Sequence, residues 1–389
     1  EQGGEPLLAV AALRRYFAAR DALDRAEGKG NHFEAANAMA RSFETLENFS
    51  DAGDGCDFGG AVAAWRWSVM QARRVIEQSG KMPPHSLEAF IGLARSRRQL
   101  ALVRQDATQL SLAIEELEDH ILLARIFKVP PRDLDQTSAW RDAQFERGLC
   151  ALELARLERA EDGFVPHRAR RWLDLARRSF DDVVQRFHEE ESDTVLRAQL
   201  ELARAEWMDG VYVPSPLSDA SLEPLKRAAA RMQALTAQLA DLRTRSDSEQ
   251  VPFEHEALER DALCLKGDVL ELLGRRLESI AAAPLGQPSD WLEARKRLED
   301  ALVAYERLER LYGLSYLCAW GLAQRIEILR LLGVRAAVDR QRAQELLDGA
   351  ERTLERIPQS QWAQAPRSMG KTYWEQWFRW YRQSRALER

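Results

Sequence analysis

Apolar residues recur at intervals of three and four along almost the whole chain, which is the spacing of one face of an α-helix. Alternating β-branched residues are rare, and the longest such run, at 211–213, stops at Pro214. Segments rich in Gly and Pro separate the periodic stretches and mark where helices end. We therefore predict an all-α protein. The expected helices span residues 5–27, 32–49, 58–79, 85–105, 107–128, 135–161, 167–188, 192–209, 221–245, 253–280, 289–312, 314–333, 339–357 and 369–387.

Four of the expected helices share one apolar pattern. Each carries a leucine, an alanine three residues later, a large apolar residue four further on, and another apolar residue after three more. Such internal similarity is typical of repeat architectures. The four sets are Leu173, Ala176, Phe180 and Val183; Leu225, Ala228, Met232 and Leu235; Leu298, Ala301, Tyr305 and Leu308; and Leu347, Ala350, Leu354 and Ile357.

Three glycines lie in the middle of helices that precede members of this set. They are Gly148, Gly267 and Gly321, and a glycine inside a helix costs about 0.5–1 kcal/mol relative to alanine. Close approach of a second helix is the best reason to keep one there. Cys264 and Cys318 each precede one of these glycines by three residues, which predicts equivalent positions in two repeats.

These features resemble the tetratricopeptide repeat, which places a glycine on the first helix of a pair and a small residue before a large one on the second. The resemblance covers about residues 140–357. It departs from that family in spacing, because the anchor leucines are 52, 73 and 49 residues apart against about 34 in the family repeat. The Trp and Tyr of the family's first helix are also mostly missing.

The resemblance implies a right-handed α-solenoid of antiparallel helix pairs with long, irregular repeats. Stacking buries the apolar face that a single pair cannot cover, and leaves an extended surface suited to binding other proteins. We expect N-terminal helix pairs over residues 1–135. Residues 136–389 would hold the tetratricopeptide-like repeats, with a capping helix at 369–387.

Charge narrows the class of partner. The net charge is −6, whereas proteins that bind nucleic acid are more often basic, so we expect no nucleic-acid partner. The basic residues are mostly arginine, with only seven lysines, which we read as the codon bias of a GC-rich genome. The basic stretch at 167–178 and the acidic run at 188–191 are read as solvated faces, with a weak site for an acidic partner left open.

No catalytic, cofactor or metal site is expected. The four cysteines lack metal or redox spacing and read as reduced core thiols, which favours the cytoplasm. The six histidines show no ligand spacing. Asp51, Asp54 and Asp57 have the wrong spacing for a calcium loop. No apolar run reaches the ~18 residues of a membrane span.

The stretch Ala-Pro-Arg-Ser-Met-Gly-Lys-Thr at 365–372 fits a loose phosphate-binding pattern. Such a loop needs a preceding strand and several backbone N–H groups, and here a polar linker precedes it and Pro366 removes one donor. We expect Ser368 to cap the last helix instead. Nucleotide binding stays a minor alternative.

Tryptophans are the candidate contacts for a partner, because Trp and Tyr anchor protein interfaces. Trp65 and Trp67 are two residues apart, so they point to different sides of one helix. We expect both to be half-buried between helix layers, with one in the core and the other an exposed contact as the alternative. The aromatic residues of helix 369–387 fall on one face, which favours a seal over the open end of the stack and leaves a partner site as the alternative. Its candidate contacts are Trp374, Trp377 and Trp380.

We therefore expect a non-catalytic scaffold that binds other proteins or peptides, with self-association also open. The chain begins with Glu-Gln-Gly-Gly, which we read as part of a longer or processed protein. That leaves a second interpretation, the solenoid part of a coat or assembly subunit that pairs a β-propeller with an α-solenoid.

Overall fold

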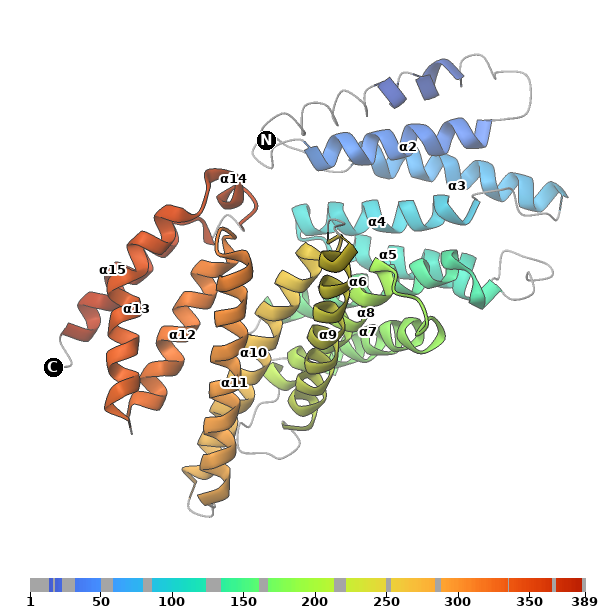
Figure 1. Cartoon of the computed structure of the whole chain (residues 1–389). Helices are drawn as coiled ribbons and strands as arrows, with labels where there is room; N and C mark the ends of the chain where they lie inside the picture. The colour runs from blue at the N-terminus through green and yellow to red at the C-terminus, as the bar shows by residue number, and fades with distance from the viewer. Residues whose placement is uncertain are drawn as a thin grey trace. The chain divides into compact units, whose positions relative to one another are not determined.

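The computed structural model describes residues 14–16, 18–22, 32–49, 59–79, 86–123, 134–160, 167–212, 222–249, 253–283, 288–334, 336–365 and 369–386, and their regular structure is helical throughout (Figure 1). The α-helices are α2 (His32–Phe49), α3 (Gly59–Ser79), α4 (Ser86–Arg104), α5 (Ala107–Leu117), α6 (Ser138–Ala160), α7 (His167–Arg186), α8 (Asp193–Tyr212), α9 (Leu222–Glu249), α10 (Glu256–Ala281), α11 (Pro288–Tyr312), α12 (Leu317–Gly333), α13 (Ala337–Arg356), α14 (Gln359–Trp362) and α15 (Lys371–Ala386).

The prediction of an all-α protein is confirmed, and most helix ends agree with it to within a few residues. The predicted helix at 5–27 lies mostly outside the described residues, although 14–16 and 18–22 are helical. Periodicity did not predict the change from α5 to a π-helical turn at Glu118–Leu122, or the single turns at Leu134–Gln136 and α14. Elements this short carry too few residues for a period to be recognised.

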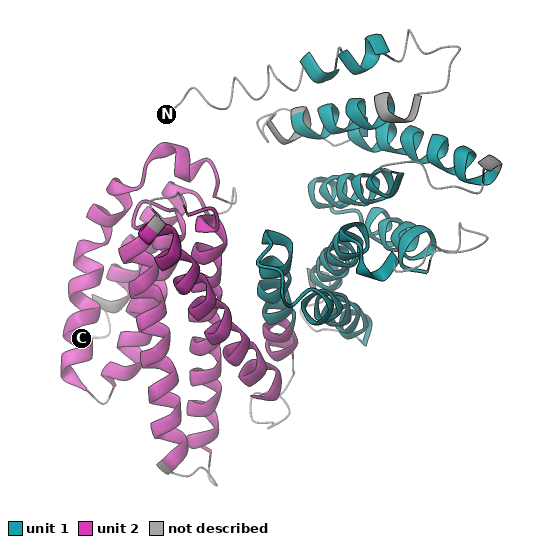
Figure 2. Ribbon diagram, turned by 45° about the vertical axis from the view of Figure 1, so that its right-hand side comes forward, with its two compact units in different colours: residues 1–205 teal, residues 206–389 magenta. Residues whose placement is uncertain are grey.

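The chain forms two compact units, Glu1–Ala205 and Glu206–Arg389, which divide within α8 (Figure 2). In the first unit each of the helices α2 to α6 contacts the next one, and α6 packs along α7. In the second unit the same holds from α9 to α13, after which α15 packs on α13. Contact between successive helices is the construction of an α-solenoid. The predicted division into helix pairs over residues 1–135 and tetratricopeptide-like repeats over residues 136–389 stays a prediction.

The repeated apolar pattern forms the core, because its sixteen positions are at most 4% exposed. Gly148 of α6 faces Phe180 of α7, and a Cβ built on the glycine would lie 2.5 Å from the ring. Gly267 of α10 faces Tyr305 of α11 in the same way, at 2.4 Å. Both glycines are therefore required by close helix approach, as predicted.

Gly321 departs from the predicted equivalence. Its nearest neighbours are Tyr305, at 3.4 Å, and Leu308, which belong to the helix before it rather than to the helix after it. Tyr305 is thus packed between α10 and α12, and its hydroxyl donates to Asp268 Oδ1 at 2.6 Å. Gly267 and Gly321 share their spacing from a cysteine, but Gly267 packs against the following helix and Gly321 against the preceding one.

Three of the four cysteines lie among the described residues, and none of these three forms a disulfide. Cys150 and Cys318 are buried and Cys264 is partly buried, which agrees with the prediction of core thiols. Burial raises the pKa of the Cys318 thiol to about 12. These residues therefore pack as small apolar side chains.

Candidate partner-binding groove

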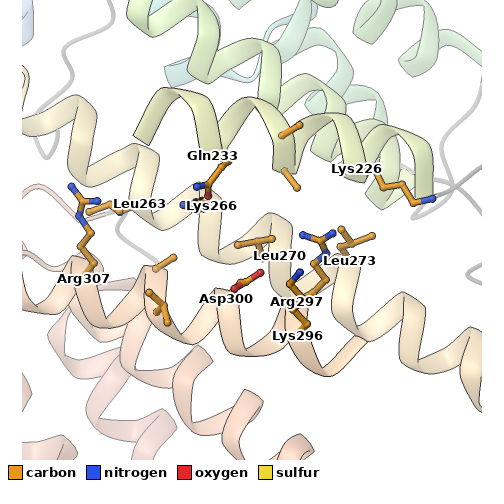
Figure 3. Close-up of a pocket in the computed structure, with 14 residues that line it drawn as sticks. Lys226, Gln233, Leu263, Lys266, Leu270, Leu273, Lys296, Arg297, Asp300 and Arg307 are labelled. Carbon is orange, nitrogen blue, oxygen red and sulfur yellow. Dashed lines mark hydrogen bonds between the residues drawn. The ribbon is translucent and has the colours of Figure 1, made fainter. Parts of the chain in front are cut away.

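A groove of about 550 Å³ lies within the second unit, between α9, α10 and α11 (Figure 3). Each helix contributes one wall or the floor, because α10 lies between the other two and contacts both. The lining residues of α9 run from 226 to 233, those of α10 from 263 to 273, and those of α11 from 296 to 307.

Positive charge dominates this groove. Five basic side chains and one acidic side chain line it, namely Lys226, Lys266, Lys296, Arg297, Arg307 and Asp300. In Figure 3 Lys226, Lys296 and Arg297 lie toward the end where α9 begins, and Lys266 and Arg307 lie toward the other. Three of the five are paired with carboxylates, Lys226 with Glu223, Arg297 with Glu293 and Arg307 with Glu259, so an entering anion would be attracted mainly by Lys266 and Lys296.

The cations differ in how firmly they are held. Arg307 Nη2 donates to Glu259 Oε1 at 2.8 Å, and Glu259 is fully buried, so the guanidinium has a fixed position. Lys266 Nζ donates to Gln233 Oε1 at 2.7 Å and to Thr236 Oγ1 at 3.1 Å.

Among the described residues, neither Lys266 nor Lys296 is paired with a carboxylate. Two of the positive charges in the groove are thus left for an external anion.

Lys266 is partly buried in the groove. Its pKa is lowered, first by burial and then by the positive charge of Arg307, with Asp300 acting in the opposite direction. A bound carboxylate would offset both unfavourable effects by adding a negative charge near the ammonium group.

The floor of the groove is apolar. Leu263, Leu270 and Leu273 of α10 are at most 4% exposed, and Val303 of α11 is 63% exposed on the wall. An exposed valine beside buried leucines offers contact to an apolar side chain, since burial contributes roughly 25 cal/mol per Å². The groove thus combines charge at its ends with an apolar middle.

Sequence reasoning did not select these residues. Three of the four described lysines line this one groove, although the scarcity of lysine was read as codon bias. The available signal was that Lys226, Lys266 and Lys296 lie on three successive helices. Using it required knowing which exposed faces meet, and local periodicity does not contain that information.

The tryptophans selected from the sequence are distributed differently. Trp65 is 1% exposed and packs against Gly92 of α4, so it belongs to the core of the first unit. Trp67 is half-buried. Trp374 is 3% exposed, Trp377 is half-buried, and Trp380 is 60% exposed. Of the five, Trp380 presents most of its side chain to solvent.

The residues Gly370-Lys-Thr open α15 and follow the short helix α14 rather than a strand. Lys371 Nζ lies 3.8 Å from Glu375 Oε1 on the same helix, an ordinary surface pair. The expected cap, Ser368, lies outside the described residues. The strand, turn and helix on which a phosphate-binding loop depends are not found in this part of the described chain.

Among the described side chains no group of three His, Cys, Asp or Glu is placed to hold a metal ion. Asp51, Asp54 and Asp57 lie outside the described residues. None of the described helices is both long enough and apolar enough to cross a membrane.

Two other charged regions are weaker candidates for binding an anionic partner. One, a hollow of about 690 Å³, lies in the first unit, but its charges pair internally, with Arg41 Nε 2.6 Å from Glu88 Oε1 and Arg95 Nη1 3.6 Å from Glu44 Oε1. The basic stretch of α7 is a solvated face in which Arg177 pairs with Asp174. The groove of the second unit differs in having charge left over.

Comparisons with known proteins support the fold. No family model matches the chain, and no curated protein matches it significantly. A solved structure of the S. pombe nuclear import adaptor Nro1 aligns with a TM-score of 0.50 and 11% identity, covering 89% of this chain and 99% of that one. A second Nro1 structure, described as a hypoxic regulator of sterol synthesis and a nuclear import adaptor, aligns with the same score and identity and is 93% covered. At this identity the likeness shows the fold alone.

Proposed function

We propose that this protein is a non-catalytic scaffold that binds other proteins, and that the groove between α9, α10 and α11 is a binding site for a partner. The observation that carries the proposal is the surplus of positive charge above an apolar floor. Electrostatic complementarity of this kind governs partner choice and association rate. The fold supports a binding role, since α-solenoids present extended surfaces and the similar structures are of an import adaptor.

The test is partner capture with charge-reversed protein. Lys226→Glu/Lys296→Glu changes two exposed lysines of the groove, and Lys371→Glu makes the same kind of change elsewhere in the second unit. Proteins captured by the wild type are identified by mass spectrometry, purified, and titrated against each variant. We expect the groove variant to lose a partner that the Lys371 variant retains, and equal binding by both would contradict the proposal.

The minor alternative, nucleotide binding at Gly370-Lys-Thr, is tested separately. We expect ATP with Mg²⁺ to leave the melting temperature unchanged. A rise that Lys371→Ala abolishes would favour the alternative. The cytoplasmic location, which was inferred from the cysteines, stays a prediction.

A further inference from the structure

We propose that the groove between α9, α10 and α11 binds an extended acidic segment of a partner protein, with carboxylates at both ends and an apolar residue between them. This rests on the proposed scaffold function and deepens it by naming the chemistry of the partner.

The two cationic groups are separated by a distance that a short extended peptide can span. Lys296 and Arg307 lie eleven residues apart on α11, which at 1.5 Å per residue is about 16 Å along the helix. An extended peptide advances about 3.3 Å per residue, so about five residues span that distance. Two acidic clusters separated by about three residues would therefore place one cluster at each end of the groove.

The part of the groove between the two cationic groups is apolar. Leu270 lies in the floor between the two cationic groups, and Val303, which is 63% exposed, stands on the wall (Figure 3 shows Leu270 and Asp300). A side chain such as leucine, placed above Leu270, would cover the exposed Val303. A polyanion without apolar groups, such as single-stranded nucleic acid, would leave Val303 in contact with water.

Asp300 is the one carboxylate among the described residues that line the groove. It lies beside Leu270 in Figure 3, between the cationic groups. Its negative charge repels an anion at the centre of the groove while leaving the ends attractive. Continuous negative charge is therefore disfavoured, and charge placed at the two ends is favoured.

The direct experiment is fluorescence anisotropy with the full chain and a labelled peptide in which two pairs of glutamates flank Ser-Leu-Ser. Three comparison probes share its length: one with all four glutamates together at one end, one with Ser in place of Leu, and one of single-stranded DNA with similar charge. We expect the split peptide to bind most tightly of the four, with affinity that falls as salt is added.

Variants assign the parts of the groove. Lys296→Glu is expected to weaken binding roughly five- to tenfold, while Lys371→Glu leaves it within about twofold. Val303→Ala is expected to weaken the leucine peptide and leave the serine peptide unchanged. Asp300→Asn is expected to tighten binding of the peptide whose glutamates are contiguous, a gain that damage to the fold would not produce.

The possible results distinguish failure of this inference from failure of the proposed scaffold function. Tighter binding of DNA than of any peptide, or equal losses for Lys296→Glu and Lys371→Glu, would overturn the inference. If no acidic peptide binds but a purified partner still requires the groove lysines, the partner chemistry is wrong and the scaffold function stands. If neither peptide nor partner depends on the groove, both proposals fail.

Discussion

At the scale of single residues, the structure explains why this chain places glycine inside helices. Gly267 has no room for a side chain because the ring of Tyr305 occupies the space. Gly349 of α13 lies in the same kind of backbone, yet the nearest atom to an added Cβ is Arg352 Nη2 at 3.8 Å. The two glycines are therefore a matched pair with opposite expectations.

We predict that Gly267→Ala destabilises the protein by about 1–3 kcal/mol, because the new methyl group forces the Tyr305 ring out of its packed position. Gly349→Ala should stabilise it by about 0.5–1 kcal/mol, because alanine loses less backbone entropy in a helix. Urea unfolding of both variants measures the difference. A Gly267 variant as stable as the wild type would show that α10 and α11 are not closely packed.

A second residue-scale prediction concerns Glu271 of α10, which is 8% exposed. Burial is the main cause that raises its pKa from 4.5 to about 7; the Arg275 guanidinium opposes this, and Asp268 and Glu327 add to it. A raised carboxyl pKa contributes stability that is complete below pH 4.5 and is lost as pH rises through about 7.

Glu271→Gln removes this titration. The free energy of unfolding of the variant minus that of the wild type should therefore be larger at pH 8 than at pH 5, by up to about 3 kcal/mol. Melting temperatures of both proteins between pH 5 and pH 8 measure this difference. Glu345→Gln, at an exposed position of α13, serves as the control. A difference between variant and wild type that does not change with pH would contradict the assignment.

At the scale of elements, α15 covers the last helices of the second unit. Trp374, Phe378 and Tyr381 are at most 3% exposed and belong to a cluster with Leu347 and Leu354 of α13. A partner test that removes Trp374 would therefore damage the fold as well, and Trp380 is the better probe. The interpretation of the aromatic face as a seal over the end of the stack stays a prediction.

Trp374→Ala is accordingly predicted to cost about 3–5 kcal/mol, as truncation of a buried aromatic side chain does. Trp380→Ala, at a side chain that is 60% exposed, should change stability by no more than about 0.5 kcal/mol. Thermal unfolding followed by circular dichroism distinguishes them. Comparable losses for both variants would mean that α15 is covered on both faces.

At the scale of the whole molecule, successive contact predicts how damage spreads. In the second unit α15 packs on α13, α13 packs on α12, and α9 and α10 lie further along the series. The stability of such arrays is approximately a sum of terms from neighbouring elements. Loss of one contact should therefore weaken its neighbours first.

In Trp374→Ala we expect faster amide hydrogen exchange in α13 and α15 and little change in α9 and α10. Mass spectrometry of peptides from each helix, at a temperature where the variant is folded, measures this. Uniform acceleration across the second unit would indicate a single cooperative core instead.

The helices, most of their ends and the sixteen buried repeat positions could be predicted from local sequence patterns. These depend on local chemistry, since helical period and breakers such as Gly and Pro act over one or two turns. Phe180 and Tyr305 could be assigned to the core because a repeated pattern marks them, and Gly148 and Gly267 because an interior glycine needs a reason.

Which helix faces meet became clear from the three-dimensional packing. The tertiary structure packed Gly321 on the preceding helix, placed Trp65 in the core, and brought Lys226, Lys266 and Lys296 to one groove although 40 and 30 residues separate them along the chain. Helical period specifies which side of a helix is buried. It does not specify which neighbour covers that side or which charged residues of separate helices come together, because those depend on long-range packing.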